Sequence, residues 1–282
     1  LKEVIEICDD VAVLRRGKVA GHADPKQSTE QSLASLMVGR DVILEVDKAP
    51  ANPTEEILTV NDLHVNDDRG LPAVEGVTFD VRRGEILGVA GVQGNGQTEL
   101  VEALTGMRSA QHGQFFIKGE NLTNASPRRI TEQGVGHVPE DRQRDGLVAS
   151  FTVMHNMVLS TYYKQKFSNN IVVDDRAIAE NASALVEQYD VRPPIINNPA
   201  GGLSGGNQQK VIVAREFSRN VELLIASQPT RGLDVGSIEF IHKQIINMRD
   251  AGAGILLVSS ELDEVLSLAD RVAVMFEGKI ID

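Results

Sequence analysis

The eight residues from Gly91 to Thr98 constrain this chain more than any other segment. They read Gly-Val-Gln-Gly-Asn-Gly-Gln-Thr and match the phosphate-binding pattern G-x-x-x-x-G-K-[ST], except that Gln97 stands where the lysine belongs. Such a loop turns tightly into a helix, and its backbone N–H groups cradle phosphates there. Gln97 brings no positive charge, whereas Thr98 keeps the hydroxyl that would face Mg²⁺. Taken alone, the octet also fits a glycine-rich strand–turn–helix corner in another α/β domain.

Further motifs follow along the chain. Residues 203–208 read Leu-Ser-Gly-Gly-Asn-Gln and precede an amphipathic run at 210–218. The apolar stretch 223–226 is followed by Ser-Gln-Pro-Thr-Arg-Gly-Leu-Asp, and the stretch 255–258 by Ser-Ser-Glu. A P-loop, an LSGGxQ-like signature, a Walker B-like strand, a D-loop and a switch strand in this order resemble the nucleotide-binding domain of ATP-binding cassette (ABC) ATPases. The resemblance covers essentially the whole chain. It implies an α/β P-loop ABC-ATPase fold, with a mixed sheet core, an antiparallel β subdomain and a helical subdomain.

Several positions that carry chemistry in that family are replaced here. The aspartate that holds Mg²⁺ and the glutamate that polarises the attacking water are matched by Ser227 and Gln228. The switch histidine is matched by Ser260, and the Q-loop glutamine, expected after a strand at 135–138, by Glu140. Phosphoryl transfer is catalysed by positioning and charge stabilisation, and neutral groups remove most of that stabilisation. We therefore expect no intact catalytic residue in this site and no ATP hydrolysis at a useful rate.

The resemblance still implies nucleotide contacts in two places. The P-loop would bind phosphates, with Thr98 as the candidate Mg²⁺ ligand. The signature and D-loop would contact ATP held by a second, head-to-tail domain, and Ser204 would do so beside its ordinary role as a helix N-cap. The predicted cofactors are ATP and Mg²⁺. The predicted contact residues are Gly91, Gly94, Asn95, Gly96, Gln97, Thr98, Glu99, Ser204, Gly205, Gly206, Asn207 and Asp234.

The first 21 residues of the chain repeat the last 21 at a constant offset of 261. This offset indicates duplication of a whole domain rather than a short solenoid repeat, although a helix, a strand and a Gly-Lys turn can also match by chance. Identical pairs are Leu1/Leu262, Glu3/Glu264, Val4/Val265, Asp9/Asp270, Val11/Val272, Ala12/Ala273, Val13/Val274, Gly17/Gly278 and Lys18/Lys279.

The repeat sets the expected domain plan. Residues 1–21 are predicted to be the tail of a preceding ABC domain and 22–56 a linker containing a short helix at 31–38. Residues 57–282 are predicted to be one nucleotide-binding domain, with its helical subdomain at about 148–203. The chain is thus expected to be a fragment of a tandem protein.

Two further segments indicate which group of ABC ATPases the chain resembles. The Met-Val-Gly-Arg run at 37–40 resembles the junction in the two-domain ATPases of bacterial importers for ribose, galactose and related solutes. In that family the C-terminal cassette often lacks the P-loop lysine. Residues 227–236 resemble the branch assigned to nucleosides. The resemblance implies a peripheral location at the cytoplasmic face of the membrane. The implied partners are an N-terminal nucleotide-binding domain, membrane permease subunits facing the helical subdomain and, indirectly, a periplasmic or lipoprotein solute-binding protein.

Composition bears on the alternatives. The net charge of −12 disfavours nucleic acid as a partner, because such binders present basic surfaces. The single cysteine, Cys8, excludes a disulfide scaffold, and six scattered histidines suggest no metal cluster. A non-transport tandem ABC protein of translation or repair would be expected to keep lysine and glutamate at both sites. A non-hydrolysing nucleotide-binding regulatory module stays open, as does a helical subdomain that is only a cap.

Alternation and apolar runs predict the secondary structure. Strands are expected at 57–65, 74–81, 85–90 and 114–118, and helices at 96–104, 153–163 and 175–189. Around 64–71, where an aromatic ring usually stacks on adenine in this family, the chain has no Tyr, Phe or Trp. Stacking worth ~1–3 kcal/mol per base is therefore absent from that loop, and the adenine contact stays unidentified.

Overall fold

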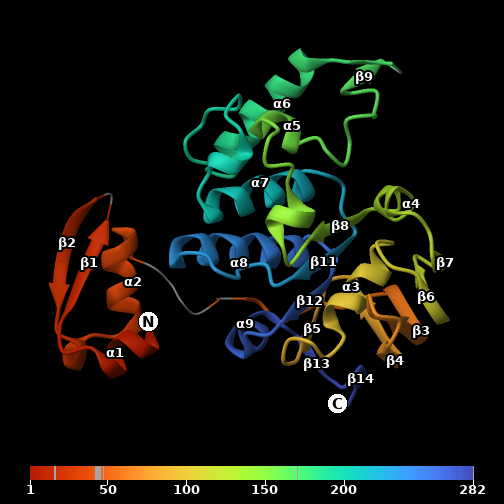
Figure 1. Cartoon of the computed structure of the whole chain (residues 1–282), viewed down its shortest axis with the longest axis horizontal. Helices are drawn as coiled ribbons and strands as arrows, with labels where there is room; N and C mark the ends of the chain where they lie inside the picture. Colours follow the sequence, from red (N-terminus) through yellow and green to blue (C-terminus); the bar gives the residue numbers. More distant parts are fainter. Residues whose placement is uncertain (16, 42–45, 47, 170, 282) are drawn as a thin grey trace.

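The computed structural model describes residues 1–15, 17–41, 46, 48–169 and 171–281. Within these residues a small N-terminal segment lies beside a larger body, which consists of two sheets with a helical part above them (Figure 1). No helix in the described part of the chain has both the length and the apolar character needed to cross a membrane.

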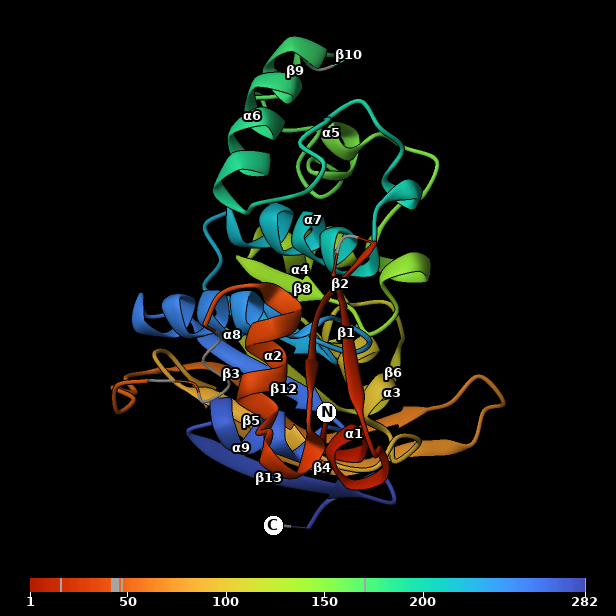
Figure 2. The ribbon, with the colours of Figure 1, turned by 90° about the vertical axis from the view of Figure 1, so that its left-hand side faces the viewer.

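The N-terminal segment is a hairpin with helices packed on it. It comprises α1 (Lys2–Ile7), β1 (Val11–Arg15), β2 (Lys18–Ala23), the 3-10 turn η1 (Pro25–Gln27) and α2 (Glu30–Val38). The helix predicted at 31–38 is confirmed. Thr29 and Ser32 form a reciprocal capping box at its start, and Gly39 ends it with a φ of 85°. Figure 2 shows α2 and the hairpin side by side on the face turned toward the viewer.

The sequence repeat is also a repeat of structure. At the C-terminus, α9 (Leu262–Leu268), β13 (Arg271–Phe276) and β14 (Lys279–Ile280) follow each other as α1, β1 and β2 do. Their surroundings differ. β13 pairs in parallel with β5 (Ile86–Ala90), whereas β1 pairs only with β2 among the described residues. The N-terminal copy exposes Ile7 and Leu14 at 78% and 71%.

One sheet is antiparallel. Its strand order is β4 (Pro72–Arg82), β3 (Glu56–Asn66), β6 (Ala110–Ile117) and β7 (Glu120–Asn121). The alternating apolar residues of β3 and β4 face the core, as expected for a sheet that is buried on one side. The strands predicted at 57–65 and 74–81 are confirmed, and the one predicted at 114–118 begins earlier, at Ala110.

The second sheet carries the nucleotide motifs. Its order is β14, β13, β5, β12 (Gly254–Ser259), β11 (Leu223–Ser227) and β8 (Val135–Val138), and all neighbours are parallel except β14 and β13. β5, β11 and β12 are buried along their whole length, as expected for strands covered on both faces. Helices α3 (Gln97–Leu104), α4 (Pro127–Glu132), α7 (Gly205–Phe217) and α8 (Val235–Asp250) accompany it. Because parallel strands end at one edge, the residues after β5, β8, β11 and β12 meet there.

The helical part differs from its prediction in one place. It contains α5 (Val153–Asn156), the short strands β9 (Ser168–Asn169) and β10 (Val172–Val173), and α6 (Asp175–Gln188). The helix predicted at 153–163 is wrong beyond Asn156, where turns replace it. The fully buried Asn156 amide donates to the carbonyls of Val148, Phe151 and Thr152. These bonds wrap the preceding loop around the helix end and favour turns over a continued helix.

Candidate functional site

The P-loop connects β5 to α3 and is held by contacts on both sides. Gly96 is the N-cap of α3 with a φ of 98°, and a Cβ there would lie 2.1 Å from the carbonyl oxygen of Ala73. Asn95 donates through Nδ2 to Val92 O and accepts at Oδ1 from the backbone N–H of Glu277. Asn95 therefore ties the loop to the turn between β13 and β14, a structural bond that its sequence position did not reveal.

Gln97 occupies the interior of the loop. Its side chain is 6% exposed, and a Cβ on Gly91 would lie 2.4 Å from its Nε2. Nε2 is buried and has no hydrogen-bond acceptor among the described residues. An unsatisfied buried donor costs ~1–3 kcal/mol, so this amide fits an acceptor such as a phosphate oxygen or a water. The first backbone N–H groups of α3 have no partner within the helix itself, and together with them the amide fits the anionic part of a nucleotide.

Glu140, which follows β8, contacts the P-loop directly. Its carboxylate accepts hydrogen bonds from Thr98 Oγ1 at 3.2 Å, Gln93 Nε2 at 3.0 Å and Arg231 Nη1 at 2.6 Å. The sequence alone identified Glu140 only as the residue that replaces the Q-loop glutamine. In the structure it brings a carboxylate beside the predicted metal-facing hydroxyl. A hydroxyl and a carboxylate, completed by phosphates and water, are a donor set that Mg²⁺ accepts.

Gln228 and Ser260 lie in direct contact. Ser260 Oγ donates to Gln228 Oε1 at 3.2 Å, and the backbone N–H of Gln228 donates to Val258 O at 2.8 Å. Gln228 has a φ of 48°, a conformation that costs a non-glycine residue on the order of 1–3 kcal/mol. Ser227 is buried at the end of β11. These three side chains can orient a water by hydrogen bonds, but none of them accepts a proton or carries charge near neutral pH.

The signature residues form the start of α7. Ser204 is its N-cap by position, but its side chain makes no capping hydrogen bond, contrary to the expected N-cap bond. Instead Ser204 Oγ accepts from Asn207 Nδ2 at 2.9 Å, and Asn207 Oδ1 accepts from the backbone N–H of Arg192. This leaves the first N–H groups of α7 without a side-chain cap from Ser204.

The two signature glycines are close to neighbouring side chains. A Cβ on Gly206 would lie 2.4 Å from Ser237 Oγ, and one on Gly205 would lie 2.7 Å from Arg142 Nη2. Asp234 caps α8 by accepting from the backbone N–H of Ser237 at 3.0 Å and from its hydroxyl at 2.7 Å. The D-loop therefore packs against the signature, which makes one continuous surface.

The remaining predicted residues have simpler surroundings. Glu99 lies half-buried in the first turn of α3, where its charge complements the helix dipole, and nothing in its contacts points to a nucleotide. Gly94 has a φ of 91° with open space around it. Sequence reasoning missed Gln93, Arg142 and Arg231, although the arginine inside Pro-Thr-Arg-Gly-Leu-Asp is a charged residue within a motif.

Buried ionisable groups brace the strands that carry the site. His242 Nε2 lies 3.0 Å and Thr230 Oγ1 2.5 Å from Glu264 Oε1. Burial opposes ionisation of Glu264, but the hydrogen bonds from His242 and Thr230 outweigh it and lower its pKa. On β8, burial lowers the pKa of His137 to about 4, so this ring is neutral at pH 7.

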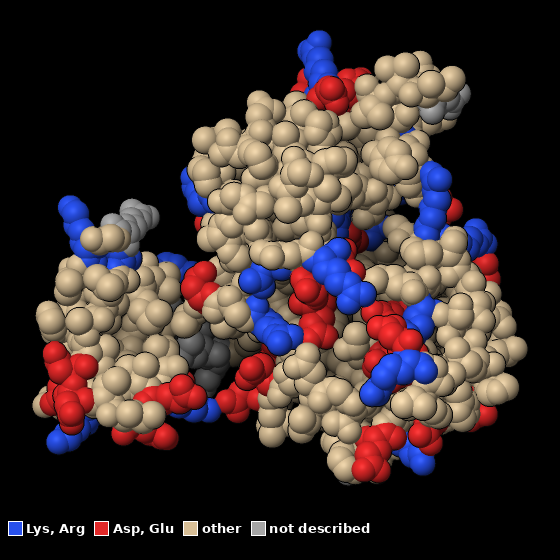
Figure 3. Space-filling view, in the orientation of Figure 1, with Lys and Arg blue, Asp and Glu red and all other residues tan. Residues whose placement is uncertain are grey.

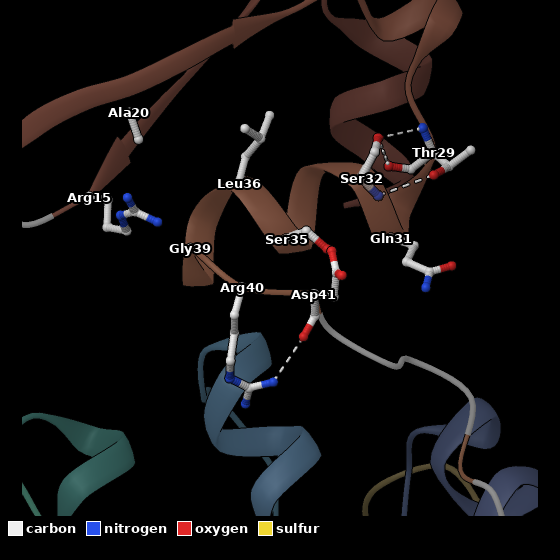
Figure 4. Close-up of a pocket in the computed structure, with 10 residues that line it drawn as sticks. All are labelled: Arg15, Ala20, Thr29, Gln31, Ser32, Ser35, Leu36, Gly39, Arg40 and Asp41. Carbon is white, nitrogen blue, oxygen red and sulfur yellow. Dashed lines mark hydrogen bonds between the residues drawn. The ribbon is translucent and has the colours of Figure 1, made fainter.

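A hollow of about 790 Å³ lies away from all these motifs, in the N-terminal segment. Figure 4 shows that β1, β2 and α2 supply its lining, with Arg15 and Arg40 on either side of Gly39. The guanidinium of Arg40 also forms an ion pair with Glu239 of α8 at 2.7 Å. None of the lining residues belongs to a nucleotide motif. On the face seen in Figure 3, acidic and basic side chains are interspersed.

Comparison with known sequences gives one family and many relatives. The family model described as "ABC transporter" matches residues 74–231. The guanosine import ATP-binding protein NupO of Bacillus subtilis is 48% identical over 98% of this chain and 54% of its own length. The nucleoside import ATP-binding protein NupA of Lactococcus lactis is 50% identical over 99% and 55%. A ribose import ATP-binding protein, RbsA of Caldanaerobacter subterraneus, is 37% identical over 99% and 55%. The chain spans about half the length of these relatives.

Solved structures share the fold at low sequence identity. A nucleotide-free ATP-binding cassette from an ABC transporter superposes with a TM-score of 0.67 at 24% identity, covering 81% of this chain and 90% of that one. A dimeric bacterial ABC transporter cassette gives 0.68 at 18% identity, covering 80% and 97%. The expected P-loop ABC-ATPase fold is confirmed by these superpositions.

Proposed function

This chain belongs to the ABC transporter family, and from that premise we propose that it is an ATP-binding part of an importer for nucleosides or simple sugars. The support is its similarity to proteins named for guanosine, nucleoside and ribose import. The nucleoside-named relatives are the more similar of the three, which favours a nucleoside as the solute. The chain would act at the cytoplasmic face of the membrane, with permease subunits and indirectly a solute-binding protein as partners.

We further propose that residues 57–282 form the second of two nucleotide-binding domains, that 22–56 link them and that 1–21 complete the first. The matching order of α1, β1, β2 and α9, β13, β14 supports this plan. So does the edge of β1 that has no strand partner among the described residues, because β13 uses the corresponding edge to pair with β5. A strand equivalent to β5, supplied by the first domain, would complete β1 in the same way.

In this proposal the chain's own P-loop site binds nucleotide without hydrolysing it. The observation that supports this is the hydrogen bond between Ser260 and Gln228, one neutral hydroxyl and one neutral amide at the positions where the family resemblance leads us to expect a histidine and a base. Gln97 and the P-loop backbone would bind phosphates, and Thr98 and Glu140 would hold Mg²⁺, which neutralises phosphate charge. Glu140 would have to share its carboxylate between the metal and Arg231.

The chain would still contribute residues to ATP hydrolysis at the site of the first domain. The uncapped N–H groups at the start of α7, with Ser204 and Gly205, would meet the γ-phosphate of ATP held by the P-loop of the first domain. The packing of Gly206 against Asp234 and Ser237 would hold that surface in place. The product of the cycle, ADP and phosphate, would form in the first domain.

The test compares two variants of the two-domain protein. Ser204→Arg should abolish solute-stimulated ATP hydrolysis, because a long cation at α7 blocks closure of the two domains. Gln97→Lys should change the rate of hydrolysis little, because Ser227, Gln228 and Ser260 still provide no metal-binding carboxylate, no base and no histidine. Normal hydrolysis by Ser204→Arg together with a doubled rate for Gln97→Lys would show that this domain is catalytic in its own right. Co-purification of a permease separates transport from a purely regulatory nucleotide-binding role.

A further inference from the structure

Arg142 lies against the start of α7, and the D-loop holds it there. Its Nη1 donates to the backbone carbonyl of Arg231 at 3.0 Å. Its Nη2 lies 2.7 Å from the place where a Cβ on Gly205 would stand. The guanidinium therefore fills the space that any larger residue at 205 would take.

The charge on Arg142 has no carboxylate partner in the described part of the chain. Its neighbour Arg231 pairs with Glu140 at 2.6 Å, whereas no ion pair within 4.0 Å involves Arg142. Asp141, next to it in sequence, accepts instead from the backbone N–H groups of Gln143 and Arg144. The Nε atom of Arg142 is buried and meets no acceptor among the described residues. The buried Nε cannot reach an external ligand, but the Nη2 N–H groups also meet no acceptor among the described residues and remain for one.

This is an unfavourable place for an unpaired cation. The N-terminus of a helix carries partial positive charge and unbonded N–H groups, which repel a guanidinium. Ser204 does not relieve the conflict, because its hydroxyl accepts from Asn207 rather than from the helix. An anion that contacts both Arg142 and the start of α7 from the surface would be attracted by both. A guanidinium suits a phosphate in particular, since its paired N–H groups match two phosphate oxygens.

We propose that Arg142 contacts the γ-phosphate of the ATP held by the other nucleotide-binding domain. This inference rests on the proposed donation of the α7 surface to that site, and it adds a positive charge to the neutral signature residues. Arg231 positions Arg142 through its carbonyl, while the side chain of Arg231 pairs with Glu140. A preorganised donor at the transferred phosphoryl group stabilises the charge that develops during hydrolysis.

The experiment measures kcat and KM for ATP in the two-domain protein. Arg142→Gln should lower kcat about 10²-fold, the effect expected when one preorganised donor is removed, while KM changes little. Trapping of ADP by orthovanadate, which mimics the transferred phosphoryl group, should fall in parallel. Arg142→Lys keeps the charge and should retain a larger share of both readouts. A merely structural role would instead lower the melting temperature and would leave the Gln and Lys variants alike.

Two companion variants separate the possible outcomes. Arg144→Gln removes the same charge from an exposed side chain two residues away, which among the described residues pairs with its neighbour Asp145, and should leave kcat unchanged. If Ser204→Arg abolishes hydrolysis while Arg142→Gln hydrolyses at the parent rate, the Arg142 contact is wrong and the donated surface stands. If both hydrolyse at the parent rate, the proposed function itself fails. A folded Arg142→Lys protein no better than Arg142→Gln in rate and trapping also contradicts the phosphate contact.

Discussion

Arg231 Nη1 lies 2.6 Å from Glu140 Oε1, while the other oxygen of the same carboxylate accepts from the Thr98 hydroxyl at 3.2 Å. One carboxylate thus joins the P-loop to the D-loop. The two residues are 91 positions apart and follow different strands, β8 and β11. Because these strands run in parallel side by side, their carboxyl ends deliver both side chains to one place.

Glu140 should control how Mg²⁺ affects nucleotide binding. In Glu140→Ala, we expect the gain in ADP affinity that Mg²⁺ produces to fall by about tenfold or more, as when the surroundings of a bound metal are altered. Calorimetric titration of this chain with ADP, with and without Mg²⁺, measures that gain. The matched variant Glu187→Gln removes an exposed carboxylate on α6 and should keep the full gain. An unchanged Mg²⁺ effect in Glu140→Ala would exclude Glu140 as a ligand.

Restoring the P-loop lysine should not make this chain an ATPase. In Gln97→Lys the charge returns, but Gln228 and Ser260 still offer no base and no histidine. We expect turnover by the purified chain to stay far below ~1 s⁻¹, the low end for ordinary enzymes. Steady-state phosphate release at millimolar Mg-ATP provides the measurement. A rate near that value in either the parent chain or the variant would contradict the proposal.

The P-loop glycines should differ sharply in tolerance. Gly96→Ala places a Cβ against the carbonyl oxygen of Ala73 and should destabilise the chain by about 1–3 kcal/mol for overpacking, in addition to the cost of its positive φ. Gly94→Ala has a similar φ but open space, so it should cost only about 1–2 kcal/mol. Urea unfolding of both variants compares them. Equal losses would show that the Ala73 contact does not constrain the loop.

His137 should make stability depend on pH between 4 and 6.5. Burial lowers its pKa to about 4 from the usual 6.5, so the unfolded chain binds a proton more readily than the folded one in this range. The contribution of His137 to the free energy of unfolding is therefore fully present above pH 6.5 and is lost as the pH falls toward 4. The loss from pH 7 to pH 5 should be about 2 kcal/mol, at ~1.4 kcal/mol per pKa unit.

The variant His137→Asn isolates this effect. It should remove the His137 share of the pH dependence, leaving the lower-pH contribution of Glu264. Because the pKa of Glu264 is lowered in the folded state, its share is present above the ordinary glutamate pKa and is lost only at more acidic pH. Urea unfolding at pH 7 and pH 5 should give a clearly smaller difference for the variant than for the parent. Equal differences would mean that folding does not lower the pKa of His137.

The order and local shape of the motifs were predictable from the amino-acid sequence. The glycines of the P-loop predicted a tight turn into a helix, the pattern at 31–38 predicted α2, and alternating residues predicted β3 and β4. These features depend on neighbours within a few positions, so backbone sterics and hydrophobic period determine them. The repeat of residues 1–21 was also visible in the sequence, and in the structure both copies run helix, strand, strand.

Tertiary structure decided which side chains meet. Asn156 ended a helix that its periodicity predicted, because a buried amide bonded to the loop before it. The sequence predicted Ser204 to be a helix N-cap, but its hydroxyl accepts a hydrogen bond from Asn207 instead. No sequence pattern indicated that Glu140, Arg231 and Arg142 lie close together, because the sheet brings together strands that are distant in the chain. The sequence alone determined that glycine-containing segments would lie at the starts of helices, and only the packing of parallel strands decided which charges lie beside them.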